Sequence, residues 1–133
     1  MVSWNNLDTL SSYKELADVK PACLTEVMSG DNGAERVKNY SIPMATGLSY
    51  NYASKQVEEN VLAALEKLAD EAQLADKFKA LYNGEVVNTG EKRLVLHHMT
   101  RGQLGDAVEA DGVDKRTFYK TQQERIAEIA TKV

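Results

Sequence analysis

The two histidines of this chain, His97 and His98, are adjacent and are the first residues to test for chemistry. Imidazoles serve as metal ligands and as general acids or bases. Neighbouring residues on a helix point about 100° apart, so this pair cannot chelate one ion. The sequence has one Cys and no HExxH pattern, so nothing in it supports zinc. We therefore predict no metal site and no cofactor, and we favour a structural role for His97 as a polar side chain held in a helix packing site.

A second group of polar residues, Arg93, His97 and Arg101, recurs at intervals of four residues. On a helix this spacing places all three side chains on one face. Two interpretations stay open for this stripe. It is either a solvated helix face or a surface that contacts a partner or a neighbouring domain.

The remaining candidates are weaker. Cys23 has only Lys20 as a basic neighbour in sequence, so we interpret it as a small apolar residue rather than a nucleophile. The acidic pairs Glu58–Glu59 and Asp70–Glu71 are predicted to be solvated. No two of the eight glycines are closer than three positions, which argues against a glycine-rich phosphate-binding turn. We predict no catalytic and no cofactor-binding residue in this sequence.

The composition is that of an ordinary globular domain, with 133 residues, of which 43% are hydrophobic and 27% charged. A net charge of −4 without basic clusters disfavours nucleic-acid binding. No apolar run reaches the roughly 20 residues that a membrane span needs. One Cys cannot form an internal disulfide, and the N-terminus lacks the pattern of a signal peptide. The expected location is cytoplasmic.

Apolar residues recur at helical spacing along most of the chain. The sequence predicts a mainly α fold, a compact helical domain of about five to six helices with at most a short strand or hairpin. Residues 29–33 are predicted as a turn and residues 48–52 as a strand. Helices are predicted near residues 7–17, 54–69, 74–82, 91–99 and 114–133. Shorter helices are predicted near 21–28 and 34–38, and a helical turn near 104–108.

Local signals mark the ends of these helices. Asn83–Gly84 suits a left-handed C-cap, Asn88 and Glu91 form a possible capping pair, and Asp114 opens the last helix. The predicted core comprises Leu62, Leu65, Leu68, Phe78, Leu81, Leu94, Val95 and Phe118.

One segment, GEVVNTGEKRLVLHHMTR, resembles a stretch near the N-terminus of glucose-6-phosphate isomerases (phosphoglucose isomerases), whose pattern is G-E-x-[IV]-N-x-T-E-x-R-x-V-L-H-x-x-x-R. Gly90 stands where the family has Thr. A second stretch, Asn51–Lys55, is similar to the family's D-Y-S-K-N. The matching positions of the first segment are Gly84, Glu85, Val87, Asn88, Glu91, Arg93, Val95, Leu96, His97 and Arg101.

The resemblance implies that residues 1–133 are the N-terminal helical segment of a longer α/β enzyme. That enzyme interconverts glucose 6-phosphate and fructose 6-phosphate in glycolysis and gluconeogenesis, and its catalytic and phosphate-binding motifs lie in later sequence. The sugar phosphate would bind only the parent protein, which is expected to be a homodimer. This segment would pack against its own α/β domains and be inactive alone.

The last helix ends on an apolar position, which either a frayed terminus or a truncated chain would explain. The resemblance favours a truncated chain, for which we predict an exposed apolar patch around Ile126, Ile129 and Val133. That patch could border the Arg93–His97–Arg101 stripe. The alternative hypothesis is a free-standing acidic helical module that binds a partner protein.

Overall fold

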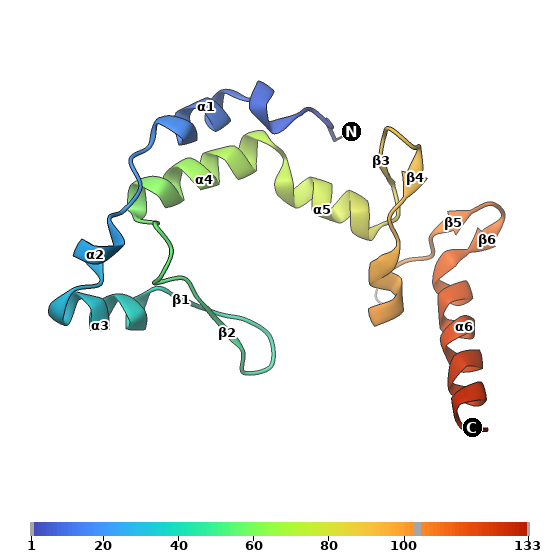
Figure 1. Cartoon of the computed structure of the whole chain (residues 1–133). Helices are drawn as coiled ribbons and strands as arrows, with labels where there is room; N and C mark the ends of the chain where they lie inside the picture. Colours follow the sequence, from blue (N-terminus) through green and yellow to red (C-terminus); the bar gives the residue numbers. More distant parts are fainter. Residues whose placement is uncertain (1, 103–104, 133) are drawn as a thin grey trace. The chain divides into compact units, whose positions relative to one another are not determined.

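The computed structural model describes residues 2–102 and 105–132, which form two compact units. The first unit is Asn5–Ala72, and the second unit is Gln73–Val133 together with Met1–Trp4. Figure 1 labels the helices and strands of each unit.

The first unit is built around two helices that lie side by side, α1 and α4 (Figure 1). Its elements in chain order are the 3-10 helix η1 (Leu7–Thr9), α1 (Ser11–Asp18), α2 (Leu24–Val27), α3 (Gly30–Asn39), β1 (Ser41–Pro43), β2 (Ser49–Asn51) and α4 (Glu59–Glu71). The strands pair in antiparallel register, with Ile42 opposite Tyr50. The hairpin turn at Thr46–Gly47 has positive φ at both residues, and Leu48 N–H donates to the Ala45 carbonyl at 3.2 Å. These features define a type I′ turn, which matches the twist of the strands.

The second unit begins with α5 and ends with the longest helix, α6. Its elements are α5 (Leu74–Tyr82), β3 (Val86–Asn88), β4 (Arg93–Leu94), the 3-10 helix η2 (His97–Arg101), β5 (Glu109–Ala110), β6 (Val113–Asp114) and α6 (Lys115–Ala130). Leu96, Met99 and Val108 form its core, and Leu94 and Tyr119 pack against them. The core is small, because only Met99 among the larger described side chains is fully buried.

The mainly α class predicted from the sequence is confirmed. The helices predicted near residues 54–69, 74–82 and 114–133 correspond to α4, α5 and α6. The predicted strand near residues 48–52 is β2, and the described residues contain three two-stranded hairpins in all. No helix in the described part of the chain has the length and apolarity needed to cross a bilayer.

Three local predictions are wrong. Residues 29–33 do not form a turn, because α3 begins at Gly30, whose φ of 60° lets the chain enter the helix directly. Gly33 then lies inside the helix, where any Cβ would overlap the Met28 carbonyl.

The helix predicted near residues 91–99 is instead the β3–β4 hairpin followed by η2. The Asn88–Glu91 pair does interact, since Asn88 Oδ1 accepts from the Glu91 N–H at 3.1 Å. That bond closes the hairpin turn and caps no helix, and Lys92 completes the turn with a φ of 53°. A helical turn is also predicted near residues 104–108. Position 104 lies outside the described residues, and residues 105–108 are not helical.

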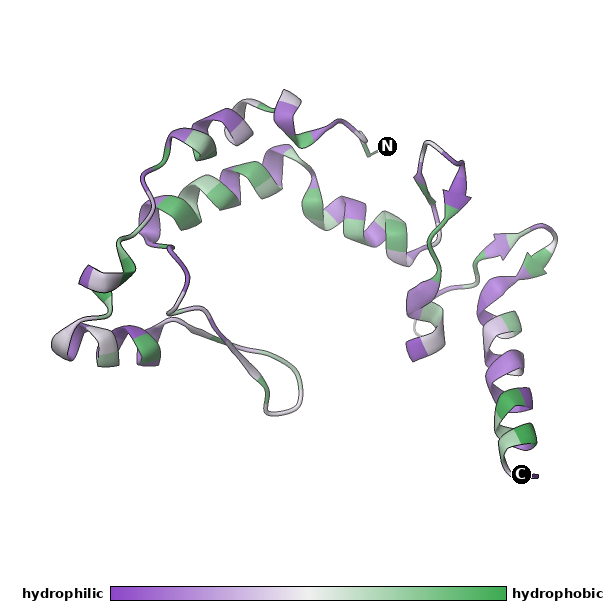
Figure 2. Ribbon diagram, in the orientation of Figure 1, coloured by the Kyte–Doolittle hydropathy of each residue, from purple (hydrophilic) through white to green (hydrophobic). Residues whose placement is uncertain are grey.

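Several predicted core residues are on the surface. Leu65, Phe78 and Phe118 are exposed, while Leu62, Leu68, Leu81, Leu94 and Val95 are half-buried. The helices therefore carry the apolar faces that the periodicity predicts, but their own units cover those faces only in part. Figure 2 shows this at the C-terminal turns of α6, where apolar residues extend to the end of the helix.

Candidate functional site

The segment that resembles the isomerase pattern builds the turn after α5, the β3–β4 hairpin and η2 in the second unit. Gly84 ends α5 with a φ of 73°, as the sequence predicts. Gly84 N–H donates to the Leu81 carbonyl at 3.1 Å and Glu85 N–H to the Ala80 carbonyl at 2.9 Å. This pair of bonds is a Schellman motif, which satisfies two of the last carbonyls of the helix. A Cβ at Gly84 would overlap the buried Val108, so the turn also needs glycine for packing.

His98 is held against the end of α5. Its ring stacks on Tyr82 with centroids 4.8 Å apart, and its Nε2 lies 3.1 Å from the Tyr82 carbonyl oxygen. A carbonyl only accepts hydrogen bonds, so Nε2 carries the proton of the imidazole. The structural role that we predicted for His97 therefore belongs to His98, since His97 is exposed.

Arg116 binds the same carbonyl. Its Nη2 donates to the Tyr82 oxygen at 3.0 Å, its Nε donates to the Asp106 carbonyl, and its guanidinium lies 5.4 Å from the centre of the Tyr82 ring. The Tyr82 carbonyl is at the C-terminal end of α5, where the helix dipole favours positive charge. Arg116, which is buried, thus fastens α6 and the loop at Asp106 to α5.

Asp114 fixes the start of α6 as its N-cap, as the sequence predicts. Its carboxylate accepts the backbone N–H groups of Arg116 at 3.1 Å and Thr117 at 3.3 Å. The Thr117 hydroxyl, which donates to the same carboxylate, is the main cause that lowers the pKa of Asp114, and the backbone N–H groups add to this effect. The charged form of Asp114 is therefore the one that holds the helix in place.

A cavity of about 430 Å³ lies beside this cluster, lined by Tyr82, His97, His98, Arg101 and Gly102. These described residues supply imidazole and guanidinium donors but no carboxylate. Such a surface can bind an anionic or carbonyl group, whereas it offers no base paired with a nucleophile. Within the described ranges, no group of three or more His, Cys, Asp and Glu residues is arranged to hold a metal ion.

The polar stripe predicted from the sequence is only partly assembled. His97 and Arg101 share η2 and line this cavity, but Arg93 lies on β4 and pairs with Glu91, with Nη1 and Oε2 3.7 Å apart. Arg93 lines a different cavity, of about 390 Å³, together with Lys92 and Lys115. The prediction of three residues on one helix face is wrong because the helix is interrupted by the hairpin.

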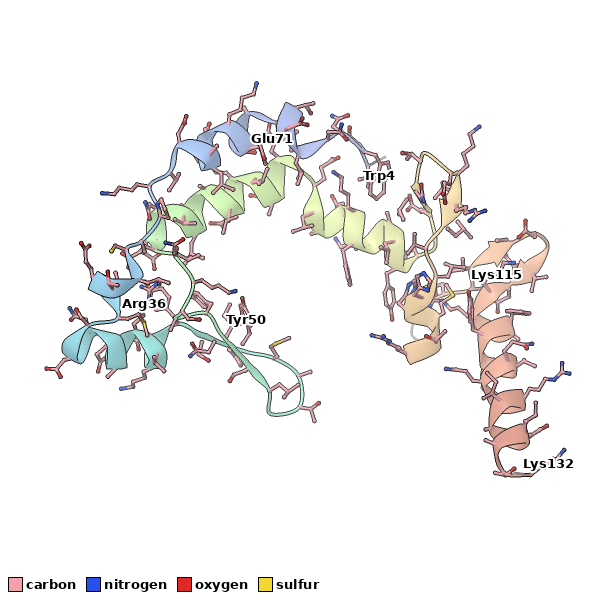
Figure 3. The ribbon with its side chains drawn as sticks, in the orientation of Figure 1. Trp4, Arg36, Tyr50, Glu71, Lys115 and Lys132 are labelled. Carbon is pink, nitrogen blue, oxygen red and sulfur yellow. The ribbon has the colours of Figure 1, made fainter. Side chains whose placement is uncertain are left out.

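In the first unit the most connected polar residue is Arg36, which sequence reasoning missed. This buried side chain donates to the Ala53, Lys55 and Val57 carbonyls at 2.8, 3.1 and 2.6 Å, and it pairs with Glu58 at 2.9 Å. Arg36 therefore fixes the irregular segment that leads into α4 (Figure 3). No local signal in the sequence distinguishes Arg36 from Lys38 on the same helix, because its acceptors lie 17 to 22 positions later in the chain.

The prediction that both acidic pairs are solvated holds for only one residue of each pair. Glu58 is half-buried beside Arg36, and Glu71 binds the start of α1, whereas Glu59 and Asp70 are exposed. Cys23 is also exposed, with its Sγ 3.1 Å from the Thr25 hydroxyl.

The fold and this site define a mainly α segment whose polar residues chiefly fasten its own helices and turns. The sequence profile of phosphoglucose isomerase matches residues 51–133, more than half of the chain. The chain therefore belongs to the phosphoglucose isomerase family, as the resemblance at residues 84–101 predicts.

Individual relatives extend the match to the whole chain. Glucose-6-phosphate isomerase of Treponema denticola is 41% identical over 137 residues, which cover 99% of this chain and 26% of the relative. The enzyme of Borreliella afzelii is 40% identical over 100% of the chain and 25% of its own length, and that of Shewanella woodyi is 34% identical over 83% of the chain. The chain thus spans about a quarter of the length of the curated relatives it matches, at their N-terminal end. These matches do not support the alternative of a free-standing interaction module.

Proposed function

We propose that this chain is the N-terminal part of a glucose-6-phosphate isomerase and that its role is architectural. The whole enzyme interconverts glucose 6-phosphate and fructose 6-phosphate, in glycolysis and gluconeogenesis, as a cytoplasmic homodimer. The observation that carries this proposal is the match of the entire chain, at about 40% identity, to glucose-6-phosphate isomerases four times as long.

The exposed apolar residues support the architectural role. Ile126 and Ile129 on α6 are 65% and 56% exposed, as we predict for a patch that normally contacts another domain, while Val133 lies outside the described residues. Every described residue from Glu124 onward is exposed, so the last turns of α6 bury little surface against the described part of their unit. Short helices in water are marginally stable without tertiary packing. The α/β domains of the parent enzyme would supply that packing.

The reaction itself is assigned to sequence beyond this segment. The described residues that line the cavity beside η2 are donors and include no carboxylate base. The isomerisation moves a proton between two carbons of the sugar, which needs a base. We therefore expect no turnover from the 133-residue chain, although the complete polypeptide is active.

A coupled assay with fructose 6-phosphate tests both statements. The protein encoded by the complete reading frame should convert the substrate, and the 133-residue chain, purified from a host that lacks its own isomerase, should not. Turnover by the short chain would overturn the architectural role. A complete reading frame without isomerase activity would overturn the proposed function.

A further inference from the structure

The surface of this chain is larger than its mass predicts. It exposes 10230 Å² to solvent. A single folded protein of 14.7 kDa exposes roughly 6,900 Å², and even two separate globular units of half that mass together expose roughly 8,400 Å². The excess of roughly 1,800 Å² is about twice what one partner contributes to a standard protein–protein interface. An excess of this size is comparable to the area that one side of a large protein–protein interface buries.

The β1–β2 hairpin of the first unit is the clearest part of this excess surface. Ile42, Met44, Leu48 and Tyr50 are 52%, 60%, 67% and 49% exposed. No charged residue occurs between Lys38 and Lys55, in a chain of which 27% is charged. Protein interfaces are depleted in charge at their centres and enriched in Tyr and Met, so this composition indicates a contact surface.

The hairpin also forms one wall of an apolar groove. The groove has a volume of about 190 Å³ and is lined by Ile42, Tyr50 and Tyr52 from the hairpin region, Lys55 and Val57 from the segment that follows, and Leu62 and Leu65 from α4. Leu65, predicted from the sequence to be buried, is exposed here. Because one charged residue stands among these seven, the groove fits an apolar occupant.

The groove is rigid at its base. The Arg36 guanidinium lies 4.1 Å from the centre of the Tyr40 ring, Tyr40 contacts Tyr52 at 5.0 Å, and Tyr52 stacks on Tyr50 at 6.2 Å. Arg36 is fixed in turn by three backbone carbonyls. Aromatic side chains held in this way lose little conformational entropy when they are covered, so the surface is preorganised for docking.

We propose that the groove between the β1–β2 hairpin and α4 receives an apolar segment from the later part of the same isomerase polypeptide. This inference rests on the proposed function. Relatives carry about three quarters of their length beyond the matched region, which is enough chain to cover a permanent interface within one subunit. A second copy of the chain is the competing occupant, and the experiment separates the two.

The test places a photo-crosslinking benzoylphenylalanine at Tyr50 in the protein encoded by the complete reading frame (Figure 3). The matched control carries the same probe at Val37 on α3, which is equally exposed at 49%. Irradiation should link position 50 to a peptide beyond residue 133, in a product that migrates at the mass of one subunit. A product at twice the subunit mass would assign the groove to a second copy. A crosslink yield no greater than that of the Val37 control would show an uncovered surface, and either result overturns the proposal.

A second measurement does not depend on crosslinking. Ile42→Glu should lower the melting midpoint of the complete protein by several degrees, because it would place a carboxylate in an apolar interface. The same substitution in the 133-residue chain, where Ile42 already faces solvent, should leave the midpoint unchanged, as should Val37→Glu in both proteins. Equal midpoints for Ile42→Glu and Val37→Glu in the complete protein would contradict the docking. If the midpoints are equal and the complete protein is an active isomerase, only the docking proposal is wrong and the proposed function is unaffected.

Discussion

Glu71, the last residue of α4, caps helix α1 through Ser12, which lies 59 positions earlier in the chain. Its Oε2 accepts the Ser12 N–H at 2.8 Å and the Ser12 hydroxyl, and its Oε1 accepts the Ser11 N–H at 3.2 Å. The residue at the N-cap position itself is Leu10, whose side chain cannot accept a hydrogen bond. A carboxylate from another helix therefore satisfies the free N–H groups of α1, where the helix dipole also favours negative charge. Figure 3 shows Glu71 between the two helices.

This cap makes stability depend on pH in the acidic range. The Ser12 hydroxyl and backbone N–H lower the pKa of Glu71 from 4.5 to about 2. The folded state binds the proton more weakly than the unfolded state, so the stabilisation is complete above pH 4.5 and is lost as the pH falls toward 2. Urea denaturation of the wild type and of Glu71→Gln should differ at neutral pH and converge toward pH 2. The control is Glu66→Gln, an exposed change on the same helix, whose free energy of unfolding should follow that of the wild type across this pH range. If the control deviates from the wild type, or if Glu71→Gln still differs from the wild type at pH 2, the cap does not cause the pH dependence.

Arg36→Lys should destabilise the first unit although it keeps the charge. Lysine lacks the planar fork with which Arg36 reaches three carbonyls and Glu58 at once, so buried acceptors would be left without donors. We expect a loss of about 2 kcal/mol in the free energy of unfolding. The control is Lys38→Arg, an exposed change on the same helix, for which we expect less than about 0.5 kcal/mol. Similar values for the two variants in urea melts would refute the role of Arg36.

Substituting two glycines that have nearly the same φ distinguishes the cost of backbone strain from the cost of steric overlap. Gly84 and Gly47 have φ of 73° and 75°, but a Cβ at Gly84 would overlap Val108, while a Cβ at Gly47 meets no atom within 4 Å. Gly47→Ala should cost about 1 kcal/mol for the left-handed backbone alone. Gly84→Ala adds the steric overlap and should cost about 3 kcal/mol. Equal losses in circular-dichroism melts would mean that the contact with Val108 is not tight.

The hairpin turn can be improved. Thr46 has a φ of 56°, a left-handed conformation that a β-branched side chain adopts at a cost, whereas Asn is the preferred residue before Gly in a type I′ turn. Thr46→Asn should therefore raise the free energy of unfolding by about 0.5–1 kcal/mol. Thr46→Val keeps the branched Cβ and serves as the control. If Thr46→Val stabilises the protein as much as Thr46→Asn does, relief of the left-handed backbone strain is not the reason for the stabilisation.

Local signals in the sequence were sufficient for the long helices and for two of their ends, whereas α4 begins at Glu59, five residues after its predicted start. Glycine at position 84 and aspartate at position 114 have the predicted roles because the C-cap and N-cap depend only on nearby backbone groups. The prediction of a helix near residues 91–99 is wrong because Asn88 can close a hairpin turn as well as cap a helix. Spacing does not distinguish these uses; the choice depends on which core the following residues, Leu96 and Met99, can enter.

The candidate site was less predictable because it depends on contacts between distant segments. Adjacent histidines give no indication of which one faces inward, and the partner that selects His98 is a carbonyl 16 positions away. Likewise, the periodicity of α4 and α5 identifies apolar faces at Leu65 and Phe78, but it cannot tell whether the same segment covers them.

The β1–β2 hairpin also matters while the protein is being made. In the proposed full-length isomerase the hairpin leaves the ribosome before the sequence that would cover it, and synthesis at about 5–20 residues per second leaves it uncovered for tens of seconds. During this time it presents unpaired strand edges and apolar side chains, features that promote aggregation between nascent chains. Lys38 and Lys55, the charged residues nearest to the hairpin on either side, stand where natural sequences place charges that oppose such aggregation.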